Sequence, residues 1–280
     1  MCLRYVGSIQ ENFKIMKYNL ISILITNYNK SKFLEKSLKS VQLQNYKNYE
    51  VIIFDDASTD NSLKIIKKFK KMKLIINKKK LYNSSALNQI NGLKKAFFKS
   101  KGKIICLMDA DDCFKKNKLF EINRYFALNK GKKVLYNLPI VAKGNNFKIS
   151  KIANNRVWPT IFPTSCISVK RDFLRLFFQN IELKNYENLE IDARVNIFFN
   201  FYLNEYNILK KRLTNYNYDY FGITSKIPKY SKKWWLRRSE AFDYLKTISL
   251  KKKILFKLNI DYLFTKFMSF ILNFKGINIK

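Results

Sequence analysis

Three short apolar runs, each ending in a polar loop and followed by a helix-like pattern, organise the first half of the chain. They occupy residues 20–25, 49–54 and 103–108. Continuous apolar runs of this length are typical of strands buried on both faces, and their alternation with helical segments predicts parallel βαβ units. Because the carboxyl ends of parallel strands meet at one edge of a sheet, we expect the loops after these runs to converge. The predicted class is therefore α/β.

Acidic turns follow two of these runs, at residues 55–60 and 109–112. Carboxylates this close together repel one another and lose hydration beside a core, and a divalent cation removes both costs. Mg²⁺ and Mn²⁺ prefer hard oxygen ligands, so we expect Asp109, Asp111 and Asp112 to hold one of them. The alternative is an acidic turn that only caps a helix starting near Lys115.

The rest of the pattern predicts further elements on the same core. Ser58 and Asp60 are suited to cap a helix over residues 63–69. Further along the chain we expect a helix over 115–129, strands over 133–136 and onward through 149, a strand over 163–171 with a helix to 178, a core helix over 195–202 and a strand pair over 207–220. No Pro/Gly/Ser-rich linker separates these segments, which favours one continuous domain.

Four motifs, at residues 23–30, 38–46, 50–60 and 107–112, occur in the order and spacing of a known family. Together they resemble glycosyltransferase family 2, the inverting group with a GT-A nucleotide-sugar-binding fold, over roughly residues 19–125. The resemblance implies a Rossmann-like, mostly parallel central sheet flanked by helices. It also implies a nucleotide-sugar donor and a divalent cation, Mn²⁺ or Mg²⁺.

The resemblance assigns roles to individual residues. Asp56 is similar to the carboxylate that accepts a hydrogen bond from uracil, and Asp111 is the expected direct ligand of the metal. The implied donor site comprises Thr26, Tyr28, Asp55, Asp56, Asn88, Asp109 and Asp111. The chain has seven glycines and no Gly-rich phosphate loop, so the metal and lysines are expected to handle the phosphates.

The chain departs from the family pattern in two places. Leu87 stands where many members carry an arginine, and a lysine among residues 78–80 is a candidate substitute. An inverting transfer also needs a general base, which cannot be histidine because the chain has none. Asn188 occupies the usual aspartate position, so we favour Asp192 as the base and keep Glu190 as the alternative. The competing interpretation is a charge pair between these carboxylates and Arg194.

The chain is strongly basic, with 55 Lys and Arg against 20 Asp and Glu and a formal net charge of +35. The lysines are scattered rather than gathered in one stripe, so anionic partners such as nucleotide phosphates and acidic lipids are expected, and nucleic acid is not. The four cysteines show no Cys-x-x-Cys spacing. Zinc and a disulfide framework are therefore not expected, and a reducing cytoplasm fits.

The two ends differ from the middle. Residues 1–18 lack the continuous apolar core of a signal peptide and are expected to be a dispensable extension. Residues 226–280 combine adjacent tryptophans with cations, and residues 254–274 predict an amphipathic helix. Its narrow polar stripe comprises Lys257, Asp261, Thr265, Ser269 and Asn273. An interfacial anchor on an anionic membrane is one interpretation, and packing on the catalytic domain or a second subunit is the other.

The function expected from these features is a metal-dependent inverting glycosyltransferase. It would move a sugar from a nucleotide donor, expected to be UDP-linked, onto a hydroxyl of a cell-envelope glycan or its lipid-linked precursor. Residues 19–125 are predicted to bind the donor, residues 126–225 the acceptor, and residues 226–280 to form a helical appendage. The alternatives are a catalytically inactive nucleotide- or carbohydrate-binding module and a sugar nucleotidyltransferase. The oligomeric state is not assigned.

Overall fold

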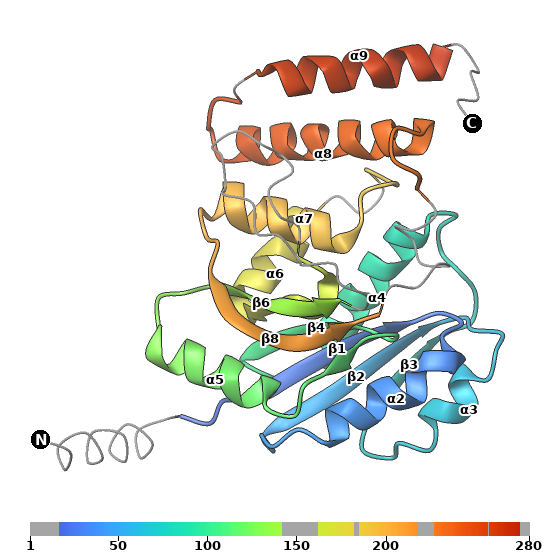
Figure 1. Ribbon diagram of the computed structural model, residues 1–280, viewed down its shortest axis with the longest axis vertical. Helices are drawn as coiled ribbons and strands as arrows, with labels where there is room; N and C mark the ends of the chain where they lie inside the picture. Colours follow the sequence, from blue (N-terminus) through green and yellow to red (C-terminus); the bar gives the residue numbers. More distant parts are fainter. Residues whose placement is uncertain (1–16, 142–161, 182–184, 218–226, 257, 275–280) are drawn as a thin grey trace, which may run out of the picture.

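A computed structural model describes residues 17–141, 162–181, 185–217, 227–256 and 258–274 of the chain. Within these residues, eight strands form one sheet of order β3-β2-β1-β4-β7-β6-β8-β5 (Figure 1). The strands are β1 (Ile21–Asn27), β2 (Tyr49–Asp56), β3 (Lys73–Asn77), β4 (Ile104–Asp109), β5 (Cys113–Phe114), β6 (Val134–Val141), β7 (Ile167–Lys170) and β8 (Ile208–Tyr216). The sheet thus joins strands from both the predicted donor half and the predicted acceptor half.

The first half of the sheet is built from the parallel units that the sequence predicts. Strand β1 pairs in parallel with β2 on one side and with β4 on the other, and β3 extends the sheet beyond β2. The helices between them are α2 (Ser31–Gln42), α3 (Ser62–Ile66) and α4 (Ser85–Lys99). Helix α3 ends three residues before its predicted end at Phe69. Ser58 does not cap it, but Asp60 accepts the N–H of Ser62, as a capping residue does.

The second half of the sheet is mixed. Strand β7 is antiparallel to both β4 and β6, and β8 runs parallel to β6 and antiparallel to β5. The predicted strand pair over residues 207–220 is wrong, because one strand, β8, crosses that segment and finds both partners elsewhere in the sheet. Strand β6 ends at Val141, and the rest of the strand prediction through residue 149 lies outside the described residues.

Helices cover both faces of the sheet (Figure 1). On one face, α2, α3 and α5 (Lys118–Leu128) pack through Leu34, Leu38, Ile66, Leu119 and Ile122. On the other face, α4, α6 (Arg171–Asn180) and α7 (Ile191–Ile197) bury a second apolar cluster. Successive strand residues alternate between the two clusters, which explains why the central strands read as unbroken apolar runs.

The C-terminal helices stack beyond α7, on the side away from the sheet (Figure 1). Helix α8 (Lys232–Lys251) packs against α7 through a third apolar cluster that includes Ile197, Phe242 and Leu245. Helix α9 (Ile260–Phe274) packs on α8 and is the outermost element in this direction. This last helix was predicted to begin at residue 254, and it begins six residues later, at Ile260. A helical appendage on a GT-A-type α/β sheet is the predicted fold class, and it is confirmed.

A glycine fixes the approach of α4 to the sheet. A Cβ added to Gly92 would lie 2.4 Å from Cδ1 of Phe54, whose ring is buried in the core. We therefore expect Gly92→Ala to lower the free energy of unfolding by about 1–3 kcal/mol, the usual cost of overpacking. Gly131 has no atom within 4 Å of its added Cβ, so Gly131→Ala is the matched control. Urea denaturation that gives equal midpoints for the two variants would contradict this account of the packing.

Candidate functional site

The carboxyl ends of β1, β2 and β4 meet at one edge of the sheet. In the strand register, Thr26 lies between Phe54 on β2 and Asp109 on β4, and Asn27 is opposite Asp55. The predicted convergence of the three loops is therefore confirmed at the level of the backbone. The polar residues that follow these strands face one shared region, which is where open α/β sheets bind ligands.

Asp55 ties the first two loops together. Its carboxylate accepts hydrogen bonds from Asn27 Nδ2 at 2.7 Å and from the hydroxyl of Ser58 at 2.7 Å, and it is fully buried. Ser58 in turn accepts the backbone N–H of Asn29 at 3.0 Å. Asp55 was predicted to contact the donor, but these bonds make it a residue that positions the loops.

Asp56, the next residue, is nearly but not completely buried. Asn77 Nδ2 donates to its Oδ1 at 3.0 Å, and the residue is 8% exposed. Tyr28 is partly exposed on the neighbouring loop, with Lys80 Nζ 3.4 Å from its ring centroid. Lys80, one of the three candidate lysines, thus lies over the loop that follows β1. A diphosphate or a base bound here would be within reach of the loops after β1 and β2.

Two carboxylates of the acidic turn take separate partners. Asp111 accepts a hydrogen bond from Lys30 Nζ at 2.6 Å, and this ion pair is mostly buried. Asp109 Oδ1 accepts from Gln89 Nε2 at 2.8 Å, and its backbone N–H donates to the Ser165 hydroxyl. Burial, followed by the neighbouring charges of Asp111 and Asp112, raises the pKa of Asp109 well above its ordinary value. The turn is thus a region of concentrated negative charge.

Asp112 does not share this environment. It is fully buried, and its Oδ1 accepts the backbone N–H of Asn217 at 2.8 Å beside β8. Burial and the charge of Asp111 raise its pKa to about 7. Among the described residues, no three His, Cys, Asp or Glu side chains are placed to hold a metal together. Asp112 thus bonds to the backbone beyond β8, and its membership of a three-carboxylate metal set stays a prediction.

The remaining pair still fits a divalent cation by donor chemistry. Asp109 and Asp111 supply hard carboxylate oxygens, and their mutual repulsion is the cost that a cation would remove. Lys30 supplies a cationic contact to Asp111. Two protein carboxylates together with phosphate oxygens are a common arrangement for Mg²⁺.

Asn88 has a structural role in the loop before α4, and its contact with the donor stays a prediction. Its amide accepts the N–H of Tyr82 at 3.0 Å and donates to the carbonyl of Tyr82 at 2.7 Å, so both of its polar atoms hold the loop before α4. Leu87, at the position of the family arginine, is buried. The polar contact from α4 to the acidic turn comes instead from Gln89, which sequence reasoning missed.

The two candidate bases lie at the start of α7 in different surroundings. Glu190 is 4% exposed and accepts a hydrogen bond from Arg237 Nε at 2.5 Å. Asp192 is less buried, and its charge acts on Asp109, raising the pKa of that carboxyl. Tyr216 at the end of β8 has its pKa raised by burial and by the charges of Asp112, Asp109, Asp192 and Asp111. Asp192 is therefore close enough for its charge to act on the acidic turn, whereas Glu190 is paired with Arg237 of α8.

Arg194, the cation of the competing interpretation, bonds to backbone carbonyls, and the charge of Glu190 also acts on it. It is fully buried and donates to the carbonyls of Leu189, Asn185 and Tyr186, so it shapes the loop before α7. The cation paired with Glu190 is Arg237, which lies 47 residues further along the chain. No local pattern signals such a partner.

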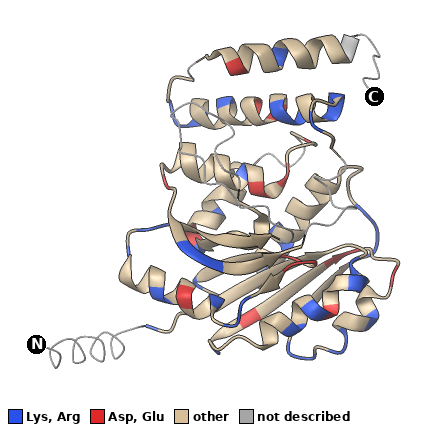
Figure 2. Cartoon of the chain, viewed as in Figure 1, with Lys and Arg blue, Asp and Glu red and all other residues tan. Residues whose placement is uncertain are grey.

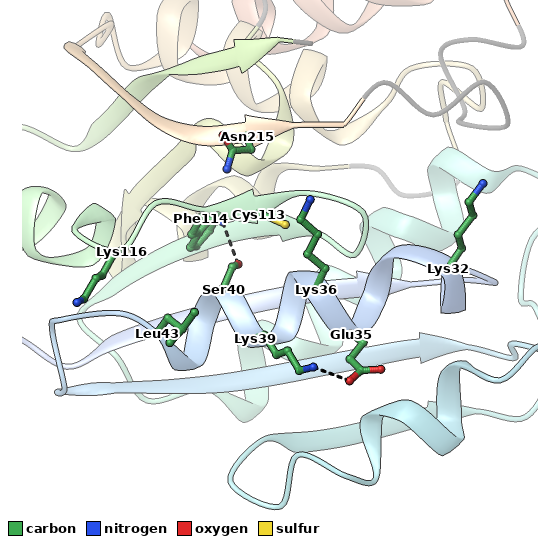
Figure 3. Close-up of a pocket in the computed structure, with 10 residues that line it drawn as sticks. All are labelled: Lys32, Glu35, Lys36, Lys39, Ser40, Leu43, Cys113, Phe114, Lys116 and Asn215. Carbon is green, nitrogen blue, oxygen red and sulfur yellow. Dashed lines mark hydrogen bonds and ion pairs between the residues drawn. The ribbon is translucent and has the colours of Figure 1, made fainter.

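A basic pocket lies beside the acidic turn rather than within this site. It has a volume of about 720 Å³ between α2 and the β5–β8 edge (Figure 3). Lys32 and Lys36 project from α2 along one side, and an ion pair joins Lys39 to Glu35 at 2.8 Å. None of the site residues predicted from the sequence lines this pocket.

The fold is shared with solved nucleotide-sugar transferases. TarS of Staphylococcus aureus, solved as residues 1–349 in complex with UDP-GlcNAc, matches with a TM-score of 0.62 and 14% identity over 92% of this chain and 74% of that chain. The mannosyltransferase PcManGT of Pyrobaculum calidifontis, in complex with GDP-Man and Mn²⁺, matches with a TM-score of 0.57 and 14% identity over 98% of this chain and 88% of that one. At this identity the likeness defines the class of fold, GT-A.

The family follows from the sequence. The model of glycosyl transferase family 2 matches residues 22–205, and the chain belongs to this family. An uncharacterized glycosyltransferase of Nostoc sp. is 30% identical over 47% of this chain and 40% of its own length. WfaP of Escherichia coli, a UDP-Glc:alpha-D-GlcNAc-diphosphoundecaprenol beta-1,3-glucosyltransferase, is 38% identical over 33% of this chain and 36% of its own length. The chain thus matches less than half the length of these two relatives.

Proposed function

We propose that this protein is a metal-dependent inverting glycosyltransferase that uses a nucleotide-sugar donor. The observation that carries the proposal is the edge where Thr26, Asp56 and Asp109 lie at the carboxyl ends of three adjacent parallel strands. The charge of Asp192 acts on Asp109 at this edge. Membership of family 2 supports the reaction class. A donor bound at this edge would have its sugar directed toward the start of α7.

UDP is the proposed nucleotide. Asp56 offers a nearly buried carboxylate oxygen to the N–H of a pyrimidine ring, while Thr26 and Tyr28 line the adjoining loop. A similar E. coli protein is named as using UDP-Glc, and TarS was solved with UDP-GlcNAc. Lys30, which pairs with Asp111, and Lys80, which lies over the ring of Tyr28, are the proposed cations for contact with the diphosphate.

Asp109 and Asp111 are the proposed holders of Mg²⁺ or Mn²⁺. Such a cation supplies charge neutralisation at the diphosphate as it leaves. In the absence of a cation, Lys30 holds Asp111 in place. Gln89 and Ser165 orient Asp109 from α4 and from the segment before β7.

Asp192 is the proposed general base. Its carboxylate would accept the proton of the acceptor hydroxyl as that oxygen attacks the anomeric carbon, and the nucleoside diphosphate would leave from the opposite side. Glu190 is the poorer candidate because it is buried against Arg237. We assign Glu190 and Arg237 to positioning the start of α7.

The proposed acceptor is a hydroxyl of a cell-envelope glycan or its lipid-linked precursor. The names of WfaP and of the teichuronic acid biosynthesis protein TuaG of Bacillus subtilis, which is 31% identical over 36% of this chain and 39% of its own length, support this class. A cytoplasmic protein on the inner face of the membrane would meet such an acceptor. Among the described residues, the helices include none long and apolar enough to cross a bilayer.

Isothermal calorimetry with UDP, GDP, CMP and dTDP, with and without Mn²⁺, tests the donor site. We expect UDP to bind in the presence of Mn²⁺ and Asp111→Ala to weaken this binding at least tenfold, because the metal-dependent part is lost. Asp172→Ala, at an exposed carboxylate on α6, is the matched control and should bind as the wild type does. Preference for another nucleotide would change the donor and keep the class of enzyme.

Two outcomes would reject the proposal. If no nucleotide bound under any condition, an inactive module would be favoured. This alternative is considered because Leu87 replaces the arginine of the family. Synthesis of a nucleotide sugar from a sugar phosphate would favour a nucleotidyltransferase. Metal-dependent hydrolysis of UDP-sugar without acceptor is expected of a transferase and not of an inactive module.

A further inference from the structure

Helix α9 is oriented with its apolar side toward solvent. The side chains of this row repeat at helical spacing and are 52–85% exposed. They are Ile260, Leu263, Phe264, Phe267 and Phe270. Apolar residues at these intervals form one continuous helical face. A helix that packs on a protein core normally buries such a face, so this orientation is the reverse of the usual one.

The polar side of α9 faces α8. Arg238 of α8 donates to Thr265 Oγ1 at 3.1 Å and pairs with Asp261. Lys266 reaches back to α8, where Asp243 accepts its ammonium at 2.6 Å and the Ser239 hydroxyl accepts it at 2.8 Å. Thr265 is fully buried by this packing. Turning the apolar face inward would break all of these contacts, so the orientation is fixed by specific bonds.

The connection from α8 to α9 continues the exposed apolar surface. Four further large apolar side chains there are 45–82% exposed, namely Leu250, Ile254, Leu255 and Leu258. Exposed lysines at 251, 252 and 253 adjoin them. Figure 2 shows Lys and Arg also distributed over α2, α5, β8 and α8. We define the exposed residues of 250–270 as the α9 surface.

We propose that the α9 surface docks on an anionic lipid bilayer, with α9 lying in the plane of the interface. Apolar side chains would enter the boundary between head groups and acyl chains, and the adjacent lysines would contact anionic head groups. The length and composition of α9 suit a helix that lies on a membrane rather than one that crosses it. This inference rests on the proposed function in one respect, namely that the proposed acceptor places the protein at a membrane.

Charge decides between a bilayer and a second copy of the chain. Asp243 and Asp261, the acidic residues nearest the surface, are already paired with Lys266 and Arg238. A second copy carries the same lysines at 251–253 and, among the described residues, no exposed acidic cluster on this surface, so it offers them no complementary charge. An anionic bilayer offers the complementary charge together with an apolar phase.

Co-sedimentation of the full chain with vesicles tests the proposal without donor or acceptor. We expect binding to phosphatidylcholine vesicles containing about 30% phosphatidylglycerol, and much weaker binding to pure phosphatidylcholine. The triple variant Ile260→Ser, Leu263→Ser, Phe267→Ser should weaken the binding roughly tenfold or more, since its apolar contact is lost. The matched control, Leu43→Ser, Phe98→Ser, Leu128→Ser, changes equally exposed residues on other elements and should bind as the wild type does.

A second pair of variants tests the charge. Changing lysines 251, 252 and 253 to Gln should weaken binding at least tenfold, because each lysine near an anionic surface contributes about a fivefold factor. Changing lysines 67, 68 and 70 to Gln removes the same charge elsewhere and is the control. Wild-type binding by the α9 triple variant, or no binding by the wild type, would overturn the proposal. A dimer in light scattering that the α9 triple variant dissociates, without vesicle binding, would assign the surface to a second copy. UDP binding measured in parallel shows whether a failure belongs to this surface or to the donor site.

Discussion

Replacing Asp192 by Asn is expected to lower kcat by about 10²- to 10⁴-fold, the usual contribution of a general base. The charge of Asp192 contributes to the raised pKa of Asp109 in the acidic turn, and the chain has no histidine to act in its place. Asparagine has the same shape but cannot accept the proton. UDP binding should change less than twofold, because Asp192 is not among the residues proposed to hold the nucleotide. Transfer rates and calorimetry on the same preparation measure both quantities.

The pH dependence gives an independent readout of this base. A base acts only when deprotonated, so activity should fall as pH drops through the pKa of the group. Burial raises the pKa of Asp192. Burial and the charge of Asp192, opposed by the charge of Arg237, raise the pKa of Glu190 to about 7. With Asp192 as the base, we therefore expect the acidic limb of kcat/KM to lie above the ordinary titration range of an aspartate.

The choice between the carboxylates at the start of α7 follows from matched variants. Glu187→Gln changes an exposed carboxylate on the same loop and should keep full activity. If Glu190→Gln abolished transfer and Asp192→Asn did not, the base would be Glu190 and the assignment to Asp192 would be wrong.

Replacing Arg237 by Leu is expected to lower the free energy of unfolding by about 3–5 kcal/mol near pH 8, the usual cost of leaving one member of a buried ion pair alone. Arg237 Nε lies 2.5 Å from Glu190 Oε2, and the side chains of the two residues are 13% and 5% exposed. The double variant Arg237→Leu, Glu190→Leu should recover much of this loss, because neither charge is then buried. Urea denaturation of the two single variants and the double variant measures the coupling.

The sign of the pH effect follows from the raised pKa of Glu190. A carboxyl whose folded pKa is about 7 holds its proton in the native state while the unfolded chain has released it above about pH 4.5. Stability contributed by this group therefore falls as pH rises from about 4.5 to 7. Without Arg237 the native pKa should rise further, so the destabilisation by Arg237→Leu should be smaller at pH 5 than at pH 8. An equal loss at both values would show that packing, not charge, is the reason for it.

The sequence predicted the donor edge well because its signals are local. Buried parallel strands are unbroken apolar runs, and the register then brings Thr26 beside Asp109 without further information. The acidic turn lies at this edge as expected, but all three of its carboxylates were expected to hold the metal. Asp112 turns toward the N–H of Asn217, 105 residues away, and no spacing within the turn reveals that contact.

The partners missed by sequence reasoning are distant in the chain. Lys30 meets Asp111 across 81 positions, and Arg237 meets Glu190 across 47. The amphipathic pattern of the last helix was recognised from the sequence. Such a pattern shows which residues share a face of the helix, but not which face packs on the protein. Which face turns inward depends on Arg238 and Asp243 of α8, whose positions only the fold supplies.

Two consecutive arginines of helix α8 form ion pairs with different neighbouring elements. Arg237 holds Glu190 beside the proposed base, while Arg238 holds Asp261 on α9. Glu240, one turn on, also accepts from the Asn188 amide, so the loop before α7 is fastened to α8 at two points. α8 therefore acts as a rigid spacer. On a bilayer, the depth at which α9 settles would set the height of Asp192 above the lipid, and with it how far a lipid-linked hydroxyl must extend to be deprotonated.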